Sequence, residues 1–407
     1  MTEFIEITGN GELKGEVRVR GAKNAVLPML IASLLTEEKV VYHNVPRLSD
    51  VHVVLSLLEH FGSETQYLND SITLSTPDIL STEASYSLVK AMRASFWVLA
   101  PVLVRGGSAK VALPGGDLIG ARPVDLHIEA LRAMGAEIKV SHGVVHAVAE
   151  NGLHPAKIKL RFPSVGATHQ ILLAASLTEG ETQIEGAARE PEVVALANLL
   201  SSMGAEIEGA GEGKVIIRGK SKLHGAEVSL IGDRIEASSY ILAAAVTKGD
   251  VKVNGFNPKH LGEFLPILKE MGIPMEIGDD FIHVKRCESI KPVTVRTEPF
   301  PGFATDIQAP LMAALCLADG ESSIEETIFE GRFGHVSELC RMGASITVDQ
   351  RIAKIKGVKQ LSGAIVEAGD IRAGAALVIA GLVAEGKTQI LEPQHIRRGY
   401  SLSLIHI

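Results

Sequence analysis

An internal repeat of about 70 residues runs through the whole chain and restricts its possible folds more than any other feature. Each unit contains a short turn, a β-prone alternation, an amphipathic helix that ends in glycine, and a further strand. Six such units in a chain of 407 residues exceed what one hydrophobic core can hold, so two domains of three units each are expected. The turns end at Glu38, Gly107, Gly180, Gly249, Gly320 and Gly386.

A second kind of helix precedes most of the turns. These segments are rich in Ala, Leu and Ile and have little polar surface, and helices that are apolar on all sides are buried ones. Because aromatic residues make up only 4% of the chain, the cores are expected to consist of aliphatic side chains. The fold class that follows is α/β, an assembly of α+β repeats. The segments span 91–104, 167–177, 235–246, 307–317 and 373–384.

Composition and motifs exclude several functional classes. The formal net charge of −8 disfavours a general nucleic-acid or anionic-membrane partner. No apolar run approaches the roughly 20 residues that span a bilayer, and no secretion signal opens the chain, so a cytoplasmic protein is expected. The three cysteines predict neither disulfides nor a zinc site, and Cys316 and Cys340 are expected to be core thiols. No dinucleotide or phosphate-loop motif occurs, and His142 and His146 have no third ligand beside them, so neither a cofactor nor a metal is expected.

The repeat has two irregularities. From turn glycine to helix-ending glycine the distance is 28 residues in the second unit, Gly107 to Gly135, but 23 or 24 in the next three units. The excess falls in the glycine-rich segment 114–123, and extra loops on a regular scaffold commonly carry function. By the same count the last unit would extend beyond Ile407, so we expect it to be incomplete, with residues 401–407 a non-native tail.

Ionisable residues recur at the start of the buried helices. Any single one of them could be a helix cap or a surface charge. Equivalent ends of symmetric units converge on one face, however, so the set predicts cations and a carboxylate in one cleft. Arg122 and Pro123 open the helix after the inserted loop, where a helix amino terminus favours phosphate. The recurring residues are Lys23, Asn24, Arg93, Arg234, Asp306 and Arg372.

Eight short segments together resemble the enolpyruvyl transferases that act on UDP-N-acetylglucosamine, and the match covers residues 4–400. The resemblance implies an inside-out α/β barrel of two domains. Residues 1–22 and 232–407 would form one domain, and residues 23–231 the other, which carries a mobile loop at 113–123. The segments are 21–25, 93–95, 113–116, 120–127, 233–236, 303–308, 330–333 and 398–400.

The same resemblance implies a reaction. The enolpyruvyl group of phosphoenolpyruvate would pass to the 3-hydroxyl of UDP-N-acetylglucosamine with release of phosphate. This is the first committed step of peptidoglycan precursor synthesis, on which cell-wall biogenesis, cell shape and cell division depend. The two substrates would be the only partners, with no cofactor or metal, and the chain would be a monomer or a weak homo-oligomer.

Site residues are implied position by position. Asp306 resembles the carboxylate that deprotonates the sugar hydroxyl, and Lys23 and Arg398 are implied as further catalytic residues. Phe162 stands where some members have a lysine. The implied substrate-binding positions are Lys23, Asn24, Arg93, Arg122, Pro123, Val124, Asp125, Leu126, Ser164, Val165, Gly166, Asp306, Ile328, Arg332, Arg372 and Arg398.

The main departure from the family pattern is Asp117. Most members have a cysteine at this loop position, which serves as proton donor, and a minority have aspartate. An aspartate with an ordinary pKa of about 3.9 must be protonated to donate, so the anionic substrates would have to raise that pKa. Because carboxyl groups react poorly with epoxides, the resemblance also implies insensitivity to fosfomycin, which alkylates the family's cysteine.

Two alternative functions remain open from the sequence. The first is the sister enolpyruvyl transferase that acts on shikimate 3-phosphate, which shares the fold and the reaction. The second is a truncated or non-catalytic paralogue that binds nucleotide sugars. The Pro-Gly-Gly-Asp loop at 114–117 favours the nucleotide sugar, and the presence of Lys23, Asp306 and Arg398 speaks against a role in binding alone.

Overall fold

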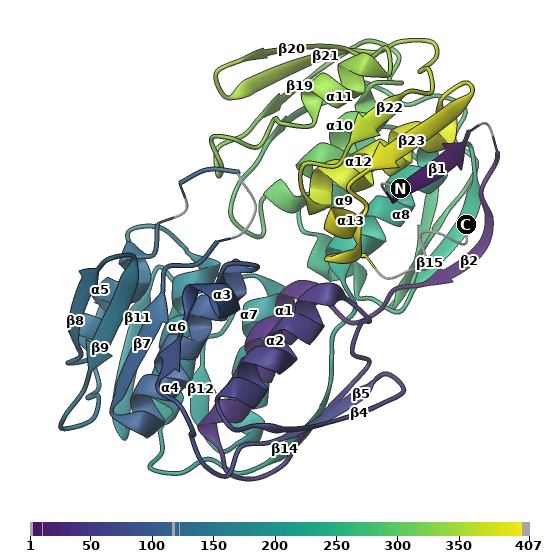
Figure 1. Cartoon of the computed structure of the whole chain (residues 1–407). Coiled ribbons are helices and arrows are strands. Elements are labelled where there is room, and N and C mark those ends of the chain that lie inside the picture. The colour runs from purple at the N-terminus through teal and green to yellow at the C-terminus, as the bar shows by residue number, and fades with distance from the viewer. Residues whose placement is uncertain (1–2, 10, 116–118, 122, 401–407) are drawn as a thin grey trace. The chain divides into compact units, whose positions relative to one another are not determined.

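The computed structural model describes residues 3–9, 11–115, 119–121 and 123–400. Two compact units make up the chain. Unit 1 comprises Met1–Arg20, Leu118–Ala121 and Gly232–Ile407, and unit 2 comprises Gly21–Asp117 and Arg122–Ile231. Figure 1 shows that each unit combines helices with several small sheets, the mixed α/β architecture expected from the repeat.

Six small sheets occur among the described residues, and five of them share one strand order. In each, a central strand pairs in parallel with an edge strand on one side and antiparallel with a hairpin on the other. Unit 2 holds three of the sheets. They are β14 (Ala226–Ser229), β3 (Val40–His43), β5 (Ser71–Ser75), β4 (Glu64–Leu68); β6 (Glu83–Ala84), β7 (Ser108–Ala112), β9 (Val144–Val148), β8 (Glu137–Ser141); and β10 (Lys157–Lys159), β11 (Gly180–Glu185), β13 (Lys214–Gly219), β12 (Glu206–Glu208).

Unit 1 holds the other three sheets. Its first strand, β1 (Phe4–Thr8), pairs antiparallel with β23 (Lys387–Leu391) near the other end of the chain, so residues more than 380 positions apart share one sheet. The sheets are β2 (Lys14–Arg18), β15 (Asp250–Asn254), β17 (Phe281–Val284), β16 (Met275–Ile277); β18 (Thr294–Arg296), β19 (Glu321–Glu325), β21 (Ile352–Lys356), β20 (Ser345–Asp349); and β22 (Ile365–Glu367), β23 (Lys387–Leu391), β1 (Phe4–Thr8).

One buried helix occurs in each repeat, as the apolar segments predict. In unit 2 these are α1 (Lys23–Ala32), α4 (Leu99–Gly106) and α6 (Val165–Ser176), and in unit 1 they are α8 (Arg234–Val246), α10 (Gln308–Leu315) and α12 (Ile371–Val383). All 13 residues of α8 are buried. Helices α8, α10 and α12 contact one another, and α4 contacts α6, so the buried helices form the centre of each unit.

A second helix in each repeat has one exposed face, which again follows the sequence pattern. The set is α2 (Ser49–His60), α5 (Asp125–Ala133), α7 (Pro191–Ser202), α9 (Phe264–Glu270), α11 (Val336–Arg341) and the short α13 (Gln394–Arg397). Two further short helices lie elsewhere: α3 (Tyr86–Val89) and the 3-10 turn η3 (Pro258–Leu261).

Two of the buried helices begin differently from the expected segments. The range 91–104 is split into a 3-10 turn, η2 (Arg93–Val98), followed by α4, and a 3-10 turn, η4 (Thr305–Ile307), precedes α10. Pro101 and Pro310 each stand at the third position of the helix that follows. Proline has no N–H for an α-helical bond to the residue four places earlier, so the tighter turn takes up the start of each helix.

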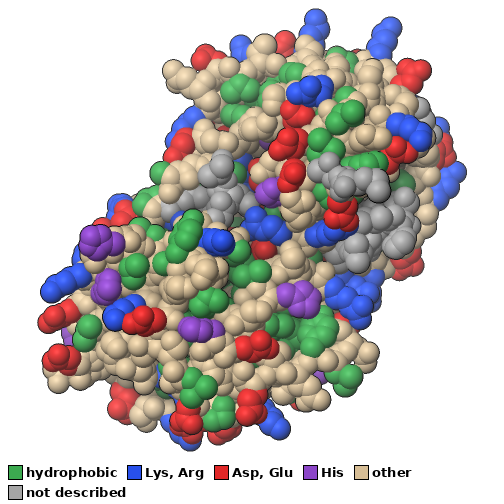
Figure 2. Space-filling model, in the orientation of Figure 1, with side chains coloured by type: hydrophobic (Ala, Val, Ile, Leu, Met, Phe, Trp, Pro, Cys, Tyr) green, Lys and Arg blue, Asp and Glu red, His purple; other side chains and the backbone are tan. Residues whose placement is uncertain are grey.

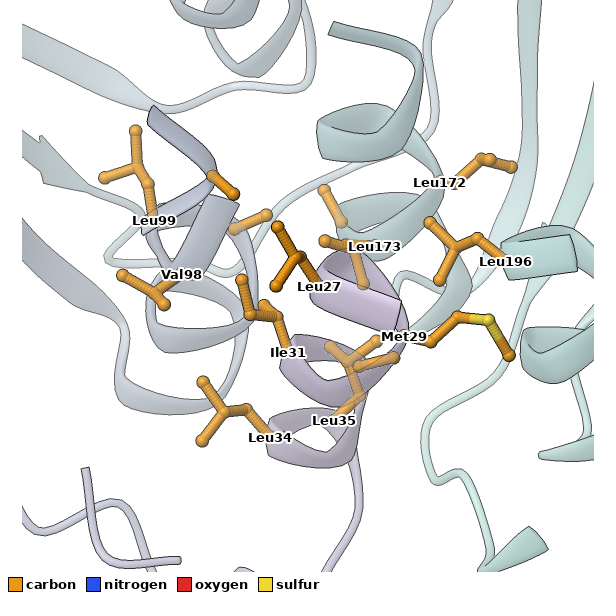
Figure 3. Close-up of a cluster of buried hydrophobic side chains, with 14 of the residues drawn as sticks. Leu27, Met29, Ile31, Leu34, Leu35, Val98, Leu99, Leu172, Leu173 and Leu196 are labelled. Atoms are coloured by element: carbon orange, nitrogen blue, oxygen red, sulfur yellow. The ribbon is translucent and has the colours of Figure 1, made fainter. Parts of the chain in front are cut away.

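Aliphatic side chains fill the cores, and each unit has a cluster of its own. Figure 3 shows part of the unit 2 cluster, where Leu27 and Ile31 of α1 lie with Leu173 of α6 and Val98 of η2. Another 3-10 turn, η1 (Ser33–Leu35), adds two leucines to it. The small number of aromatic residues is therefore compensated by close packing of branched aliphatic chains.

The prediction that Cys316 and Cys340 are buried is right for one of them and wrong for the other. Cys316 is buried, but Cys340 is exposed, so its assignment to the core was wrong. Leu339 is the buried residue of the short helix α11, and Met342, directly after the helix, is buried as well. Cys340 lies outside this buried side and is exposed.

Charges of both signs are mixed over the face shown in Figure 2. Among the described residues, none of the helices combines the length and the apolar character that a membrane crossing requires. Within the same residues, no group of three or more His, Cys, Asp or Glu side chains is arranged to hold a metal ion.

Candidate active site

A carboxylate held between two arginines is the most distinctive feature of unit 1. Asp306, in η4, accepts hydrogen bonds from Nη2 of Arg332 at 2.7 Å and from Nη2 of Arg372 at 2.9 Å, one on each oxygen. The side chains of both arginines are about 5% exposed, whereas that of Asp306 is 24% exposed. The carboxylate is thus fixed by buried cations while part of it still faces outward.

Repeat symmetry explains why two of these residues meet. Asp306 and Arg372 each lie 14 residues before the turn glycine of their own unit. Helix α10, which follows Asp306, packs against α12, and Arg372 lies in the first turn of α12. Asp370 caps α12 by accepting the N–H groups of Arg372 at 2.7 Å and Ala373 at 2.9 Å. Because α10 and α12 pack together, residues at the equivalent starts of the two helices come into contact.

The two arginines set the ionisation of Asp306. Burial alone would raise the pKa of this carboxyl, but the charges and hydrogen bonds of Arg372 and Arg332 outweigh it and hold the pKa well below its usual range. For Arg372, burial opposes the charged form, but the facing Asp306 prevails and raises the pKa. Asp306 is therefore an ionised, strongly hydrogen-bonded and weakly basic carboxylate.

A directional chain of hydroxyls lies behind Arg372. Ser239 of α8 donates its only hydroxyl proton to the carbonyl of Ile235 at 3.1 Å, so the buried phenol of Tyr400 must donate to Ser239 at 2.8 Å. The phenol oxygen is then left to accept from Nη1 of Arg372 at 3.4 Å. Burial, the largest influence, raises the pKa of Tyr400, so the phenol stays neutral in this role.

Other residues implied for unit 1 lie in two further places. Ile328, half-buried, follows β19, and Arg398, also half-buried, follows α13. Residues 119–121, from the glycine-rich loop, lie against residues 330–331. There the N–H of Ala121 donates to Glu330 at 3.0 Å, and that of Gly331 to the Ile119 carbonyl at 3.0 Å.

In unit 2 a second ion pair is almost fully buried. Lys23 is the first residue of α1, and its Nζ lies 3.0 Å from Oδ2 of Asp50, in the first turn of α2. The two residues are 8% and 2% exposed. Asn24, next to Lys23, is half-buried. The sequence analysis singled out Lys23 and Asn24 but not Asp50, because Asp50 belongs to none of the quoted segments.

Arg93 and the segment 123–126 lie together in unit 2. Nη2 of Arg93 donates to the carbonyl of Pro123 at 2.9 Å, so the guanidinium lies near the start of α5. Val124 is buried, whereas Leu126 is half-buried. The carboxylate of Asp125 forms an ion pair with Arg161.

The start of α6 is tied to the same region. Ser164 caps the helix by accepting the N–H of Ala167 at 3.2 Å, with Val165 and Gly166 following it. Nε1 of Trp97 donates to the Gly166 carbonyl at 2.9 Å. A Cβ at Gly166 would lie 2.8 Å from a ring nitrogen of His127, so any larger residue here would require the His127 ring to shift. Phe162, two residues before the cap, is 43% exposed.

The sequence-predicted set is therefore divided between the two units. Unit 1 brings together Asp306, Arg332 and Arg372, and unit 2 brings Arg93 together with residues 123–126. That all of them share one cleft stays a prediction. Asp117 and Arg122 lie outside the described residues. The sequence did not single out Asp50, Trp97 or Tyr400. In the structure Asp50 contacts Lys23, Trp97 donates to the Gly166 carbonyl, and Tyr400 accepts from Arg372. Tyr400 had a signal in the sequence, because it closes the segment 398–400.

Three buried histidines make folding sensitive to acid. Burial lowers the pKa of His127 and His169 to about 3, and that of His335 to about 4. In the unfolded chain these groups take up protons near pH 6.5. Stability is therefore fully present above pH 6.5 and should fall as the pH drops from 6.5 to 4, by up to about 1.4 kcal/mol per pH unit for each histidine.

Urea unfolding at pH 7.5, 6.5, 5.5 and 4.5 measures this dependence. The variant His169→Gln should have a shallower pH dependence, whereas the exposed His142→Gln should keep the wild-type slope. A free energy of unfolding that stays constant between pH 7.5 and 4.5 would contradict the neutral, buried state of these imidazoles.

Structures of known proteins define the class to which this fold belongs. The crystal structure of the enolpyruvyl transferase NikO from Streptomyces tendae matches with a TM-score of 0.88, at 24% identity, over 98% of this chain and 94% of that one. EPSP synthase from Acinetobacter baumannii matches with a TM-score of 0.71, at 20% identity, over 98% and 99%. The fold is that of the enolpyruvyl transferases, and the predicted α/β class is confirmed.

Sequence comparison narrows the class to a family. The family model described as EPSP synthase (3-phosphoshikimate 1-carboxyvinyltransferase) matches residues 7–402. UDP-N-acetylglucosamine 1-carboxyvinyltransferase 2 of Staphylococcus saprophyticus is 49% identical over 98% of this chain and 95% of its own length. The enzyme named UDP-N-acetylglucosamine 1-carboxyvinyltransferase in Elusimicrobium minutum is 48% identical over 97% and 94%. The chain belongs to this family of transferases, which confirms the resemblance expected from its motifs.

Proposed function

We propose that the chain transfers the enolpyruvyl group of phosphoenolpyruvate to the 3-hydroxyl of UDP-N-acetylglucosamine and releases inorganic phosphate. The observation that carries this proposal is Asp306, a partly exposed carboxylate held in place by two buried arginines, in a chain 47–49% identical to enzymes named for that reaction.

The reaction needs a proton acceptor at the sugar and a proton donor at the other substrate. As the sugar oxygen attacks C2 of phosphoenolpyruvate, its proton passes to Asp306, and C3 gains a proton from Asp117. The tetrahedral adduct then loses a proton from C3 and expels phosphate, which restores the double bond. These assignments follow the family pattern, and the geometry of Asp306 supports the first of them.

Low basicity limits how Asp306 can act. A carboxylate whose pKa is held down by two guanidinium groups does not remove a proton from a hydroxyl before the attack begins. It can accept a hydrogen bond from the hydroxyl and receive the proton as the new C–O bond forms and the oxygen becomes acidic. The arginines therefore favour proton transfer in step with bond formation.

Cations are required because both substrates are anionic. Phosphoenolpyruvate carries a phosphate and a carboxylate, and the nucleotide sugar carries a diphosphate. We assign Lys23, Arg93, Arg122 and Arg398 to these groups, with Arg332 and Arg372 contributing through Asp306. Burial of Lys23 beside Asp50 supports a fixed ammonium at the start of α1.

The nucleotide would bind at the helix starts of unit 2. Residues 123–126 at the beginning of α5 and residues 164–166 at the beginning of α6 are linked through Arg93, Trp97 and His127. Free backbone N–H groups at helix amino termini suit a diphosphate. We place the reaction in the cytoplasm, where three unpaired cysteines are stable, and its product would enter peptidoglycan synthesis.

Phosphate release from the purified chain tests the proposal. Phosphoenolpyruvate with UDP-N-acetylglucosamine should give stoichiometric phosphate and a UDP-sugar product heavier by one enolpyruvyl group in mass spectrometry. Shikimate 3-phosphate in place of the nucleotide sugar should give none. Turnover with shikimate 3-phosphate would favour the sister reaction, and binding of the nucleotide sugar without any turnover would favour a non-catalytic paralogue.

A further inference from the structure

A buried carboxylate that the proposed function leaves unassigned organises the turn after β19. Glu326 is 1% exposed, and its Oε1 accepts hydrogen bonds from the N–H groups of Ile328 at 2.9 Å and Phe329 at 3.0 Å. The hydroxyl of Thr297 donates to the same oxygen at 3.0 Å. Burying a carboxylate is costly unless donors replace the lost water, and three donors converge here. One side chain thus fixes the backbone of residues 328–329.

The second oxygen of Glu326 reaches the Asp306 cluster through a hydroxyl. Thr305 donates its only hydroxyl proton to Oε2 at 2.9 Å, which leaves the lone pairs of Thr305 free to accept. Nη1 of Arg332 donates to them at 2.9 Å, while Nη2 of the same guanidinium donates to Asp306. The hydrogen bonds therefore run in one direction, from Arg332 through Thr305 to Glu326.

Glu326 also acts on the face of the same guanidinium. The ring of Phe329 lies under Arg332, with the central guanidinium carbon 5.2 Å from the ring centroid. Glu326 accepts hydrogen bonds from the N–H of Phe329 and the hydroxyl of Thr305. It therefore positions both the ring that lies against the face of the Arg332 guanidinium and the hydroxyl that accepts from its edge. The remaining terminal nitrogen of Arg332 is the one that binds Asp306.

We propose that Glu326 is a positioning residue for the transfer reaction: it orients Arg332, and through it Asp306, and it fixes the backbone of Ile328 where the nucleotide sugar is expected. This inference rests on the proposed function, in which Asp306 receives the proton of the sugar hydroxyl. Small displacements matter, since a misplacement of about 1 Å can reduce a rate about 100-fold.

The variants Glu326→Gln and Thr305→Val separate the two arms of this arrangement. In Glu326→Gln the amide NH2 faces a hydrogen-bond donor from which the carboxylate oxygen had accepted, so that hydrogen bond is lost. The value of kcat should therefore fall about tenfold or more, and KM for UDP-N-acetylglucosamine should rise. Thr305→Val removes only the hydroxyl step, so kcat should fall without the rise in KM. Thr305→Ser keeps a hydroxyl and should recover most of the loss.

The neighbouring carboxylate supplies a matched control. Glu325 is 43% exposed and lies 3.6 Å from Arg296 on the surface, so Glu325→Gln should keep wild-type kcat and KM. If Glu326 acts in positioning, the losses in kcat of Glu326→Gln and Thr305→Val overlap in the double variant, because both break the same chain of bonds. A purely structural role would lower the melting temperature but leave kcat per active site unchanged.

Three results would overturn the inference: wild-type kcat in folded Glu326→Gln, fully additive losses in the double variant, or equal kcat for Thr305→Val and Thr305→Ser. The last comparison decides the matter alone if Glu326→Gln does not fold. Absence of turnover by the wild-type chain, measured in the same series, would instead overturn the proposed function.

Discussion

Replacing Asp306 with asparagine should reduce kcat by about 10²- to 10⁴-fold, the range expected for loss of an acid–base group. Asparagine keeps the shape of the side chain but cannot take a proton. Its NH2 group would also face one of the two guanidinium groups that the carboxylate now accepts from. Binding of UDP-N-acetylglucosamine, measured by calorimetry, should change little, because the proposed role of Asp306 is to receive the proton of the sugar hydroxyl and not to bind the nucleotide.

Two controls accompany this variant. Asp319→Asn changes an exposed aspartate at the end of the same repeat and should leave kcat and stability unchanged. Thermal unfolding of Asp306→Asn tests whether the two unpaired arginines destabilise unit 1, since breaking a buried ion pair can cost about 3–5 kcal/mol. If folded Asp306→Asn keeps wild-type kcat and only raises KM, the assignment of Asp306 as proton acceptor is wrong.

We expect the chain to resist fosfomycin, and replacing Asp117 with cysteine should make it subject to time-dependent inactivation by this epoxide. A thiolate is a strong nucleophile near neutral pH, whereas a carboxylate attacks an epoxide poorly. Either side chain can deliver a proton, so Asp117→Cys should retain turnover. Intact mass spectrometry after incubation should show one adduct on the variant and none on the wild-type chain.

Peptide mapping is needed because another thiol is accessible. Cys340 is exposed, so the adduct must be located on the peptide that contains residue 117 and not on the one that contains residue 340. Asp117→Ser is the matched control, because it has neither a thiol nor a carboxyl and should lose turnover while remaining unmodified. An adduct on wild-type Asp117, or none on an active Asp117→Cys, would show that this is not the family's proton-donor position.

The repeat predicted the arrangement of helices well because that arrangement is local. Apolar segments such as 235–246 predicted the buried helix α8, whose observed range is Arg234–Val246. The segment 91–104 was predicted less well, since Pro101 interrupts the α-helical bonding and gives η2 before α4. On α11 the same reasoning misplaced Cys340, because a helix of six residues has too few turns for its buried side to be read from spacing alone.

By itself, the sequence determined the number of repeats, the α/β class, and the equivalence of Asp306 and Arg372 in neighbouring units, because periodicity and spacing are properties of the chain. Only the tertiary structure decided which atoms meet. Asp306 binds arginines 26 and 66 residues away, Lys23 pairs with Asp50, and Glu326 governs Arg332 through Thr305. These contacts depend on how α10 packs against α12 and α1 against α2, and on the direction of each hydroxyl proton. Neither is encoded in residue spacing, since hydrogen bonds are set by side-chain geometry in the folded core.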